Sequence, residues 1–197
     1  TRELENSAFS FSDYLINDDR RLMNLTDEIR NDGKFSVFHR LDRLSLTYKK
    51  ENLVVTLGRQ AITWGNGLIF SPMDIVNPFS PTVVDTEYKT GDDMVYGQYL
   101  LASGDDIQVA HVLRDKSVIN STVSSATTTA VKYHGMTDNA EYDVLLARSY
   151  GATTMGLGAS KSLGGAVIRG DAVWIDTMMG HRLQLVMNVT HSWIWGG

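Results

Sequence analysis

The 197-residue chain contains no cysteine, which excludes disulfide bonds, zinc sites with thiolate ligands and thiol nucleophiles. It also lacks any run of about 18 apolar residues, so no transmembrane helix is expected, whereas a membrane-spanning strand needs only about 10 residues. A formal net charge of −5 provides no basic surface for nucleic acid. The hydrophobic content is an ordinary 43 %, which suits one domain with a sizeable core. The lack of cysteine fits a periplasm-facing compartment, although many cytosolic proteins share it.

What the chain does have is apolar residues at every second position. Leu53, Val55 and Leu57 alternate with small or polar residues, and the same period recurs along most of the chain. Because successive side chains of a strand point to opposite faces, this period predicts strands with one apolar and one polar face. Strands are predicted at residues 36–48, 53–62, 94–101, 107–114, 127–134, 141–149, 154–161, 166–175 and 182–195.

The connections between these strands fall into two alternating classes. Short turns rich in Gly, Asp, Asn or Ser occupy residues 49–52, 103–106, 135–140 and 162–165. The other connections are long at residues 63–93 and 115–126 and intermediate at 150–152 and 176–181. Outer-membrane barrels place short turns at one rim and longer loops at the other. We therefore predict an all-β fold, an antiparallel up-and-down transmembrane β-barrel, with a soluble all-β domain as the alternative.

The N-terminal region has a different pattern. Leu22, Leu25 and Ile29 lie at near-helical spacing among charges, which predicts a short amphipathic helix over residues 18–32 in an external loop. Residues 9–12 alternate phenylalanine with serine and predict one more strand, which makes ten. Ten strands satisfy the even number of bacterial single-chain barrels.

We expect the chain to be part of a larger barrel, because Trp195-Gly196-Gly197 stands where a periplasmic turn should begin. In this interpretation residues 1–33 form a strand and a helical loop. Residues 34–197 form successive β-hairpins of the same domain.

Aromatic residues mostly fall near predicted strand ends. Membrane barrels carry aromatic girdles at their two interfaces, although aromatic residues favour strands in any setting. The interface residues predicted on this basis are Tyr48, Trp64, Tyr142, Trp174, Trp193 and Trp195.

One segment carries a family resemblance. Gly58-Arg59-Gln60 and Trp64-Gly65, followed by Asn77-Pro78 and Asp92-Asp93, resemble a little-characterised group of proteobacterial outer-membrane, porin-like β-barrel proteins. In that group such a strand end leads into a loop with Asn-Pro and then an acidic hairpin start. The resemblance is clearest over residues 41–95. It implies an outer-membrane location in contact with lipid or lipopolysaccharide and a transport role, with room for a periplasmic or inner-membrane transport partner.

The long loop at residues 63–93 is the first candidate site. Arg59 shares the strand parity of the apolar face, unless a bulge at Gly58 turns it inward. We predict that the loop enters the lumen as a constriction; the alternative is that Arg59, Asp74 and Asn77 only tie it to the barrel wall. The constriction candidates are Arg59, Gln60, Asp74, Asp85, Glu87, Lys89, Asp92 and Asp93.

Charged residues on the polar faces of later strands form the second candidate set. Opposed charges in a pore create a field that filters solutes by charge. The alternative is a network of solvated ion pairs that stiffens the barrel. By strand parity the candidates are Lys132, Glu141, Asp143, Lys161, Arg169 and Asp171.

Patterns typical of enzymes are missing. The five histidines show no HxxxH or HxH spacing for a metal site. No GxSxG elbow and no helix-opening G-x-G-x-x-G is present. We therefore expect no catalytic site, metal or cofactor. The expected function is a porin-like channel or exporter barrel for small solutes, and the alternatives are a structural barrel with a plugged lumen and a soluble binding domain.

Overall fold

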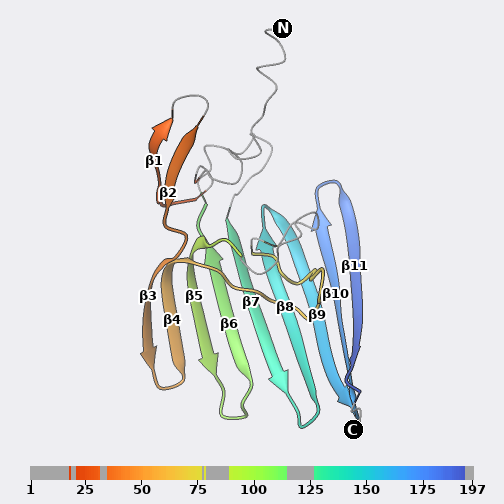
Figure 1. The fold of residues 1–197 in the computed structure, drawn as a ribbon. Coiled ribbons are helices and arrows are strands. Elements are labelled where there is room, and N and C mark those ends of the chain that lie inside the picture. Colours follow the sequence, from red (N-terminus) through yellow and green to blue (C-terminus); the bar gives the residue numbers. More distant parts are fainter. Residues whose placement is uncertain are drawn as a thin grey trace.

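Antiparallel strands make up the regular structure of the computed structural model, which describes residues 18, 21–31, 35–76, 78, 89–114 and 127–193 (Figure 1). A two-stranded sheet comes first, formed by β1 (Thr26–Asn31) and β2 (Ser36–Arg40). A nine-stranded sheet follows, in which every strand pairs with its neighbours in sequence. Its strands are β3 (Leu44–Lys50), β4 (Leu53–Gln60), β5 (Asp92–Leu100), β6 (Asp106–Val112), β7 (Thr128–Met136), β8 (Ala140–Ser149), β9 (Ala152–Leu163), β10 (Ala166–Thr177) and β11 (Gly180–His191).

The predicted all-β class and antiparallel pairing are confirmed, and from β4 onward the predicted strands differ only at their ends. The single strand predicted at residues 36–48 is instead two strands, β2 and β3, in different sheets. The chain bends between them, where Leu41 N–H donates to the Leu25 carbonyl at 2.9 Å and Arg40 pairs with Asp42 at 2.8 Å.

The helix predicted over residues 18–32 is wrong, because the segment contains β1 and the described residues contain no helix. The Asp18 carboxylate accepts hydrogen bonds from Leu25 N–H and Thr26 Oγ1, which fixes the chain just before β1. Leu22 and Ile29 are exposed and Leu25 is half-buried, so the stripe does not form a continuous buried face. The strand predicted at residues 9–12 lies outside the described residues.

The two rims of the large sheet carry different connections. In Figure 1 the turns after β3, β5, β7 and β9 lie along the lower rim, and the long connection from β4 to β5 leaves from the upper rim. The sorting is weaker than predicted, because the β8–β9 and β10–β11 connections at the upper rim are also tight turns.

The nine-stranded sheet is open. Its order begins at β11 and ends at β3, and these two edge strands do not pair with each other. The predicted closed barrel is therefore not confirmed.

One face of the sheet, called here the exposed face, is apolar. Cross-strand pairing places one row of residues across all nine strands, and each member is exposed or half-exposed. The row consists of Tyr48, Val55, Gly97, Val109, Val131, Leu146, Met155, Trp174 and Leu183.

The apolar band runs obliquely to this row. Within β3, Tyr48 is the last exposed apolar residue before the lysines of the lower rim. Within β11, Leu183 is the first, and Leu185, Met187 and Val189 continue toward the lower rim, with Leu185 69 % exposed. The band therefore shifts along the strand direction from one edge of the sheet to the other.

The opposite face, called here the covered face, carries small, polar and charged residues. Residues 61–76, called here the covering loop, cross this face from β4 toward β10 (Figure 1). The covered face holds the buried side chains of Ala110, Ala130, Lys132, Asp143, Leu145, Thr154, Asp171 and Val173.

Candidate functional site

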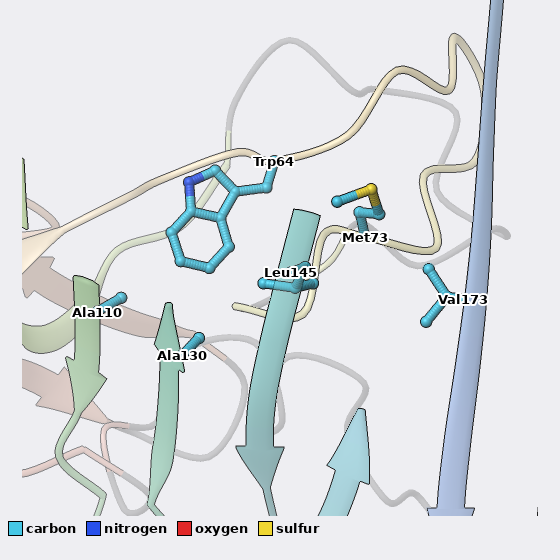
Figure 2. Close-up of a cluster of buried hydrophobic side chains, with 6 residues drawn as sticks. All are labelled: Trp64, Met73, Ala110, Ala130, Leu145 and Val173. Carbon is cyan, nitrogen blue, oxygen red and sulfur yellow. The ribbon is translucent and has the colours of Figure 1, made fainter. Parts of the chain in front are cut away.

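The covering loop is held on the sheet by a small apolar core. Trp64, only 3 % exposed, and Met73 extend from the loop toward Ala110, Ala130, Leu145 and Val173 (Figure 2). The four strand residues come from β6, β7, β8 and β10. The loop thus bridges almost the whole width of the sheet.

Asn66 fixes the far end of the covering loop on two carboxylates. Its backbone N–H donates to Asp171 Oδ2 at 2.8 Å, and its Nδ2 donates to Asp171 Oδ1 at 2.9 Å and to Asp143 Oδ2 at 3.4 Å. Asp143, Gly158 and Asp171 are consecutive in one cross-strand row. A Cβ on Gly158 would lie 2.8 Å from Asn66 Nδ2, so the glycine makes room for the amide between the two carboxylates.

Gly65 gives the loop its approach to Asp171. Its φ of +100° is strained for any residue with a side chain, and a Cβ there would lie 1.9 Å from Ser71 Oγ. Ser71 Oγ in turn donates to the Trp64 carbonyl at 3.0 Å. The Trp-Gly-Asn sequence therefore has a geometric reason at each position.

Polar contacts surround the Trp64 ring. Its Nε1 donates to Gln108 Oε1 at 2.7 Å, which satisfies the buried indole. The Lys132 ammonium lies 5.9 Å from the ring centroid and 3.2 Å from Asp143 Oδ1. His134 Nδ1 lies 2.9 Å from the same Asp143 oxygen. Lys132 and Asp143 thus form an ion pair beneath the loop.

Lys89 closes the covering loop at its other side. Its Nζ donates to both Asp74 carboxylate oxygens, at 2.6 and 2.7 Å, and to the Ile62 carbonyl at 2.6 Å. Burial raises the pKa of the Asp74 carboxyl and lowers the pKa of the Lys89 ammonium, while the attraction between the two groups opposes both shifts. The pair ties the beginning of the loop, its end and the chain before β5 together.

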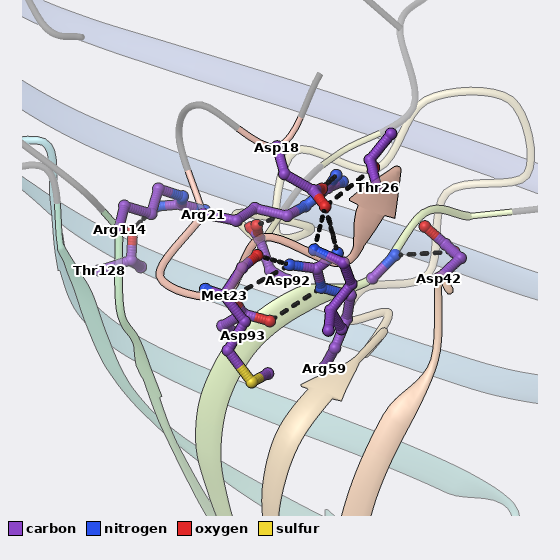
Figure 3. A network of polar contacts seen from close by, with 12 residues as sticks. Asp18, Arg21, Met23, Thr26, Asp42, Arg59, Asp92, Asp93, Arg114 and Thr128 are labelled. Atoms are coloured by element: carbon purple, nitrogen blue, oxygen red, sulfur yellow. Dashed lines mark hydrogen bonds and ion pairs between the residues drawn. The ribbon is translucent and has the colours of Figure 1, made fainter. Parts of the chain in front are cut away.

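A second cluster, called here the rim network, lies at the upper rim, where β4 and β6 end and β5 begins (Figure 3). Its centre is Arg59, 0 % exposed, whose guanidinium donates to both oxygens of Asp18 at 3.0 Å and to Asp93 Oδ1 at 2.9 Å. Arg59 also donates to the Met23 carbonyl, and Met23 N–H donates to Asp93 Oδ2 at 2.7 Å. The members of the rim network are Asp18, Arg21, Arg59, Asp92, Asp93 and Arg114.

The rim network binds the segment before β1 to the large sheet. Burial alone would raise the pKa of Asp18, but hydrogen bonds from Arg21, Arg59, Leu25 N–H and Thr26 together hold it well below its usual range. A carboxyl whose pKa is lowered by folding stabilises the native state above its unfolded pKa, about 4, and loses that contribution as the pH falls.

Acid titration should therefore separate the wild type from Asp18→Asn. We expect the wild type to lose stability steeply below about pH 4, because the unfolded chain takes up a proton at Asp18 while the native carboxylate stays ionised beside Arg59. The variant should start lower at neutral pH and show a shallower loss over the same range. Thermal unfolding followed by circular dichroism at a series of pH values measures both slopes, and equal slopes would refute a role for Asp18 in acid sensitivity.

The structure distributes the predicted site residues over three places. Lys132, Asp143 and Asp171 lie together beneath the covering loop, Asp74 and Lys89 close the loop, and the rim network contains Arg59, Asp92 and Asp93. Gln60 only donates to the Thr56 carbonyl, and Arg169 lies apart, beside Thr190. Asp85 and Glu87 lie outside the described residues.

One parity prediction needs correction, and the burial of Arg59 needs a separate explanation. Lys161 pairs with Ile168 and shares the parity of Leu157, so it belongs to the exposed face, since one step along a strand changes the face. Arg59 is buried although the pairing of β4 with β3 and β5 continues without a bulge at Gly58. It is buried because Asp18, Met23 and Asp93 surround it.

Trp64 also differs from its prediction as an interface residue, because it forms the core beneath the loop. Tyr48 and Tyr142 are exposed, Trp193 is 75 % exposed, and Trp174 stacks on His181 with ring centroids 5.4 Å apart. Trp195 lies outside the described residues.

Neither the family models, nor the curated proteins, nor the solved structures with which the chain was compared give a match. The function is therefore inferred from this site and this sheet. Within the described ranges, no helix is long and apolar enough to span a membrane. The same ranges contain no group of three or more side chains that is suited to hold a metal ion.

Sequence reasoning missed Asn66 and Gln108 and the contacts by which they fix the loop. Asn66 and Asp171 are separated by 105 positions, and Trp64 and Gln108 by 44, so no local pattern joins them. The only local signal was the Trp-Gly-Asn-Gly run itself. Chemically, the arrangement holds a loop firmly across a polar face.

Proposed function

We propose that the protein is an outer-membrane β-barrel protein, a porin-like channel or exporter component, and that the covering loop narrows its lumen. The observation that carries this proposal is the contrast between the two faces of the sheet. Leucine, valine and methionine side chains cover the exposed face without a polar layer over them. A soluble protein rarely leaves so large a continuous apolar surface in water.

The oblique course of the apolar band supports a membrane setting further. Strands of a closed barrel tilt by roughly 35–45° from its axis, so a band parallel to the membrane must cross the pairing rows at an angle. The apolar band agrees with such a tilt. Tyr48 lies at the lower end of the band in β3, and its counterpart in the row, Leu183, lies at the upper end of the band in β11. A band that follows a flat soluble interface has no reason to shift.

In this proposal the covered face lines the lumen, and the covering loop lies inside it. The loop spans the face from β4 to β10, so a solute would have to pass beside it. Lys132, Asp143 and Asp171 are buried beneath the loop, so in this proposal they act on a passing solute through their charge rather than by contact. Loops folded inward are a physical means of setting pore size and charge selectivity.

The first experiment is extraction followed by gel mobility with and without boiling. A detergent-dependent protein whose mobility changes on boiling supports the barrel, and stepwise conductance in a planar bilayer then supports a channel. A protein that is freely soluble and unshifted would overturn the proposal in favour of a soluble all-β domain.

A structural barrel with a plugged lumen is the second candidate. It is favoured by the tight attachment of the loop, through the Trp64 core, the Asn66 contacts and the Asp74–Lys89 pair. A heat-modifiable protein without conductance would favour this candidate over the channel.

Asn66→Ala should loosen the constriction without unfolding the protein. The variant loses the side-chain contacts to Asp171 and Asp143 but keeps Trp64 in place, so we expect larger or noisier single-channel currents and a stability loss of about 1–3 kcal/mol. Asn139→Ala is the matched control, because Asn139 is exposed in a turn at the opposite rim. Identical currents for wild type and both variants would show that Asn66 does not shape the pathway.

A further inference from the structure

The two edges of the nine-stranded sheet run in the same direction. Each of the eight junctions between β3 and β11 is antiparallel, so an even number of reversals separates the edges. Both edge strands therefore run from the upper to the lower rim (Figure 1). Direct pairing of β3 with β11 would form the only parallel junction of the sheet.

β11 does not have the features of a strand that ends a sheet. Natural edge strands are short, bulged, or protected by charges and proline. β11 has 12 residues, an unbroken register with β10, no proline and, apart from its two histidines, Arg182 as its one charged residue. Nearby, Asn188 Nδ2 is buried and has no hydrogen-bond partner among the described residues. These features of β11 are typical of a strand that pairs with a neighbour on both sides.

The covering loop also presents an apolar tip. Leu68, Ile69 and Phe70 are exposed, with Ile69 at 93 %. They follow Asn66, which is fixed near β10, so the tip lies at the side of the covered face that ends in β11. Further strands added to the sheet beyond β11 would cover these side chains.

We infer that β3 and β11 are joined in the functional protein through an odd number of further strands of the same polypeptide, antiparallel at both junctions. This inference rests on the proposed barrel, because unpaired backbone groups at an open edge are very costly in lipid. An odd number is required because only then are both new junctions antiparallel. The total then becomes even, as in bacterial single-chain barrels.

A second copy of this chain does not fit the edges. A two-fold axis along the barrel would bring β11 beside the β3 of the other copy, which gives parallel junctions. A two-fold axis across the strands would give antiparallel pairs, but it would place the upper rim of one copy beside the lower rim of the other. Chains inserted in one direction cannot adopt the second arrangement.

Backbone hydrogen bonds on the free side of β11 supply the test. Ser192 N–H donates to the Gly165 carbonyl at 2.9 Å. Because these bonds alternate along an antiparallel pair, Gln184 N–H points to β10 and Leu185 N–H points to the free edge. Proline removes the donor at either position, and it is tolerated only where the N–H has no strand partner.

Leu185→Pro and Gln184→Pro should therefore be compared in the protein as cells make it, with Leu185→Ala and Gln184→Ala as controls for the side chains. We expect both proline variants to reduce the heat-modifiable fraction to a similar extent, well below both alanine variants. A Leu185→Pro variant that assembles like Leu185→Ala, while Gln184→Pro does not, would overturn the inference.

Oxidative cross-linking is a second test of which strands lie beside β3 and β11. Introduced cysteines can be used for it because the chain has no cysteine of its own. Tyr48→Cys and Leu185→Cys, which both lie on the exposed face, should give, alone and combined, neither disulfide-linked dimers nor an internal bond between β3 and β11 in heat-modifiable protein. Dimers would assign the edges to a second copy, and an internal bond would show direct closure; either overturns the inference while leaving the barrel intact. Absence of heat modifiability in the wild type would instead contradict the proposed function.

Discussion

Replacing Arg59 with alanine should lower the free energy of unfolding by about 3–5 kcal/mol. The side chain is fully buried and pairs with Asp18 and Asp93, so its loss leaves Asp93 without this cation and Asp18 with Arg21 alone. Denaturant unfolding from detergent measures the change as a lower midpoint. We expect the single-channel conductance of the folded molecules to stay at the wild-type value, because Arg59 lies in the rim network and outside the covering loop.

Arg169→Ala is the matched control for Arg59→Ala. Arg169 lies on the same sheet and makes a single long contact with Thr190 at 3.3 Å, so its removal should change stability by about 0.5 kcal/mol or less. An Arg59→Ala variant as stable as Arg169→Ala would show that the rim network does not stabilise the fold. An altered conductance at unchanged stability would instead place Arg59 in the pathway.

Replacing Trp64 with alanine should have the largest effect on the covering loop. The change removes the indole from the core beneath the loop and its hydrogen bond to Gln108, a loss of about 3–5 kcal/mol. Part of that loss is expected as detachment of the loop rather than unfolding of the sheet, since the strands keep their own pairing. Planar-bilayer recording should then show a larger single-channel conductance.

Trp193→Ala makes the same chemical change at an exposed position and should leave stability within about 0.5 kcal/mol and conductance unchanged. A conducting Trp64→Ala beside a silent wild type would identify the plugged barrel. Equal conductance of the wild type and Trp64→Ala would mean that the loop does not limit passage.

The strands were predictable because their cause is local. Alternation in Leu53, Val55 and Leu57 and turn residues at Gly164 and Gly165 act within a few positions, and the structure follows them. The helix was mispredicted because tertiary contacts overrode a weak apolar stripe. Asp18 bonds to Leu25 and Thr26 directly before β1, and the strand is then completed by pairing with β2.

The candidate site was only partly predictable for the same reason. Parity correctly brought Asp143 and Asp171 to one face, because parity is a local property of each strand. It could not show that Asn66 inserts between them, since that depends on the crossing of the loop and on the space above Gly158. Parity did not predict the burial of Arg59, because residues far away in sequence decide whether a position at a strand end is covered.

The link between Asn66 and Asp171 has a consequence for the order of assembly. Every strand of the large sheet pairs with its neighbour in sequence, so the sheet can grow hairpin by hairpin with little loop-closure entropy at each step. The contact between Asn66 and Asp171 spans 105 positions and cannot exist until β10 is in place. During folding the covering loop therefore cannot reach its final position before β10 has formed, and until then the polar face that it finally occupies is accessible to water.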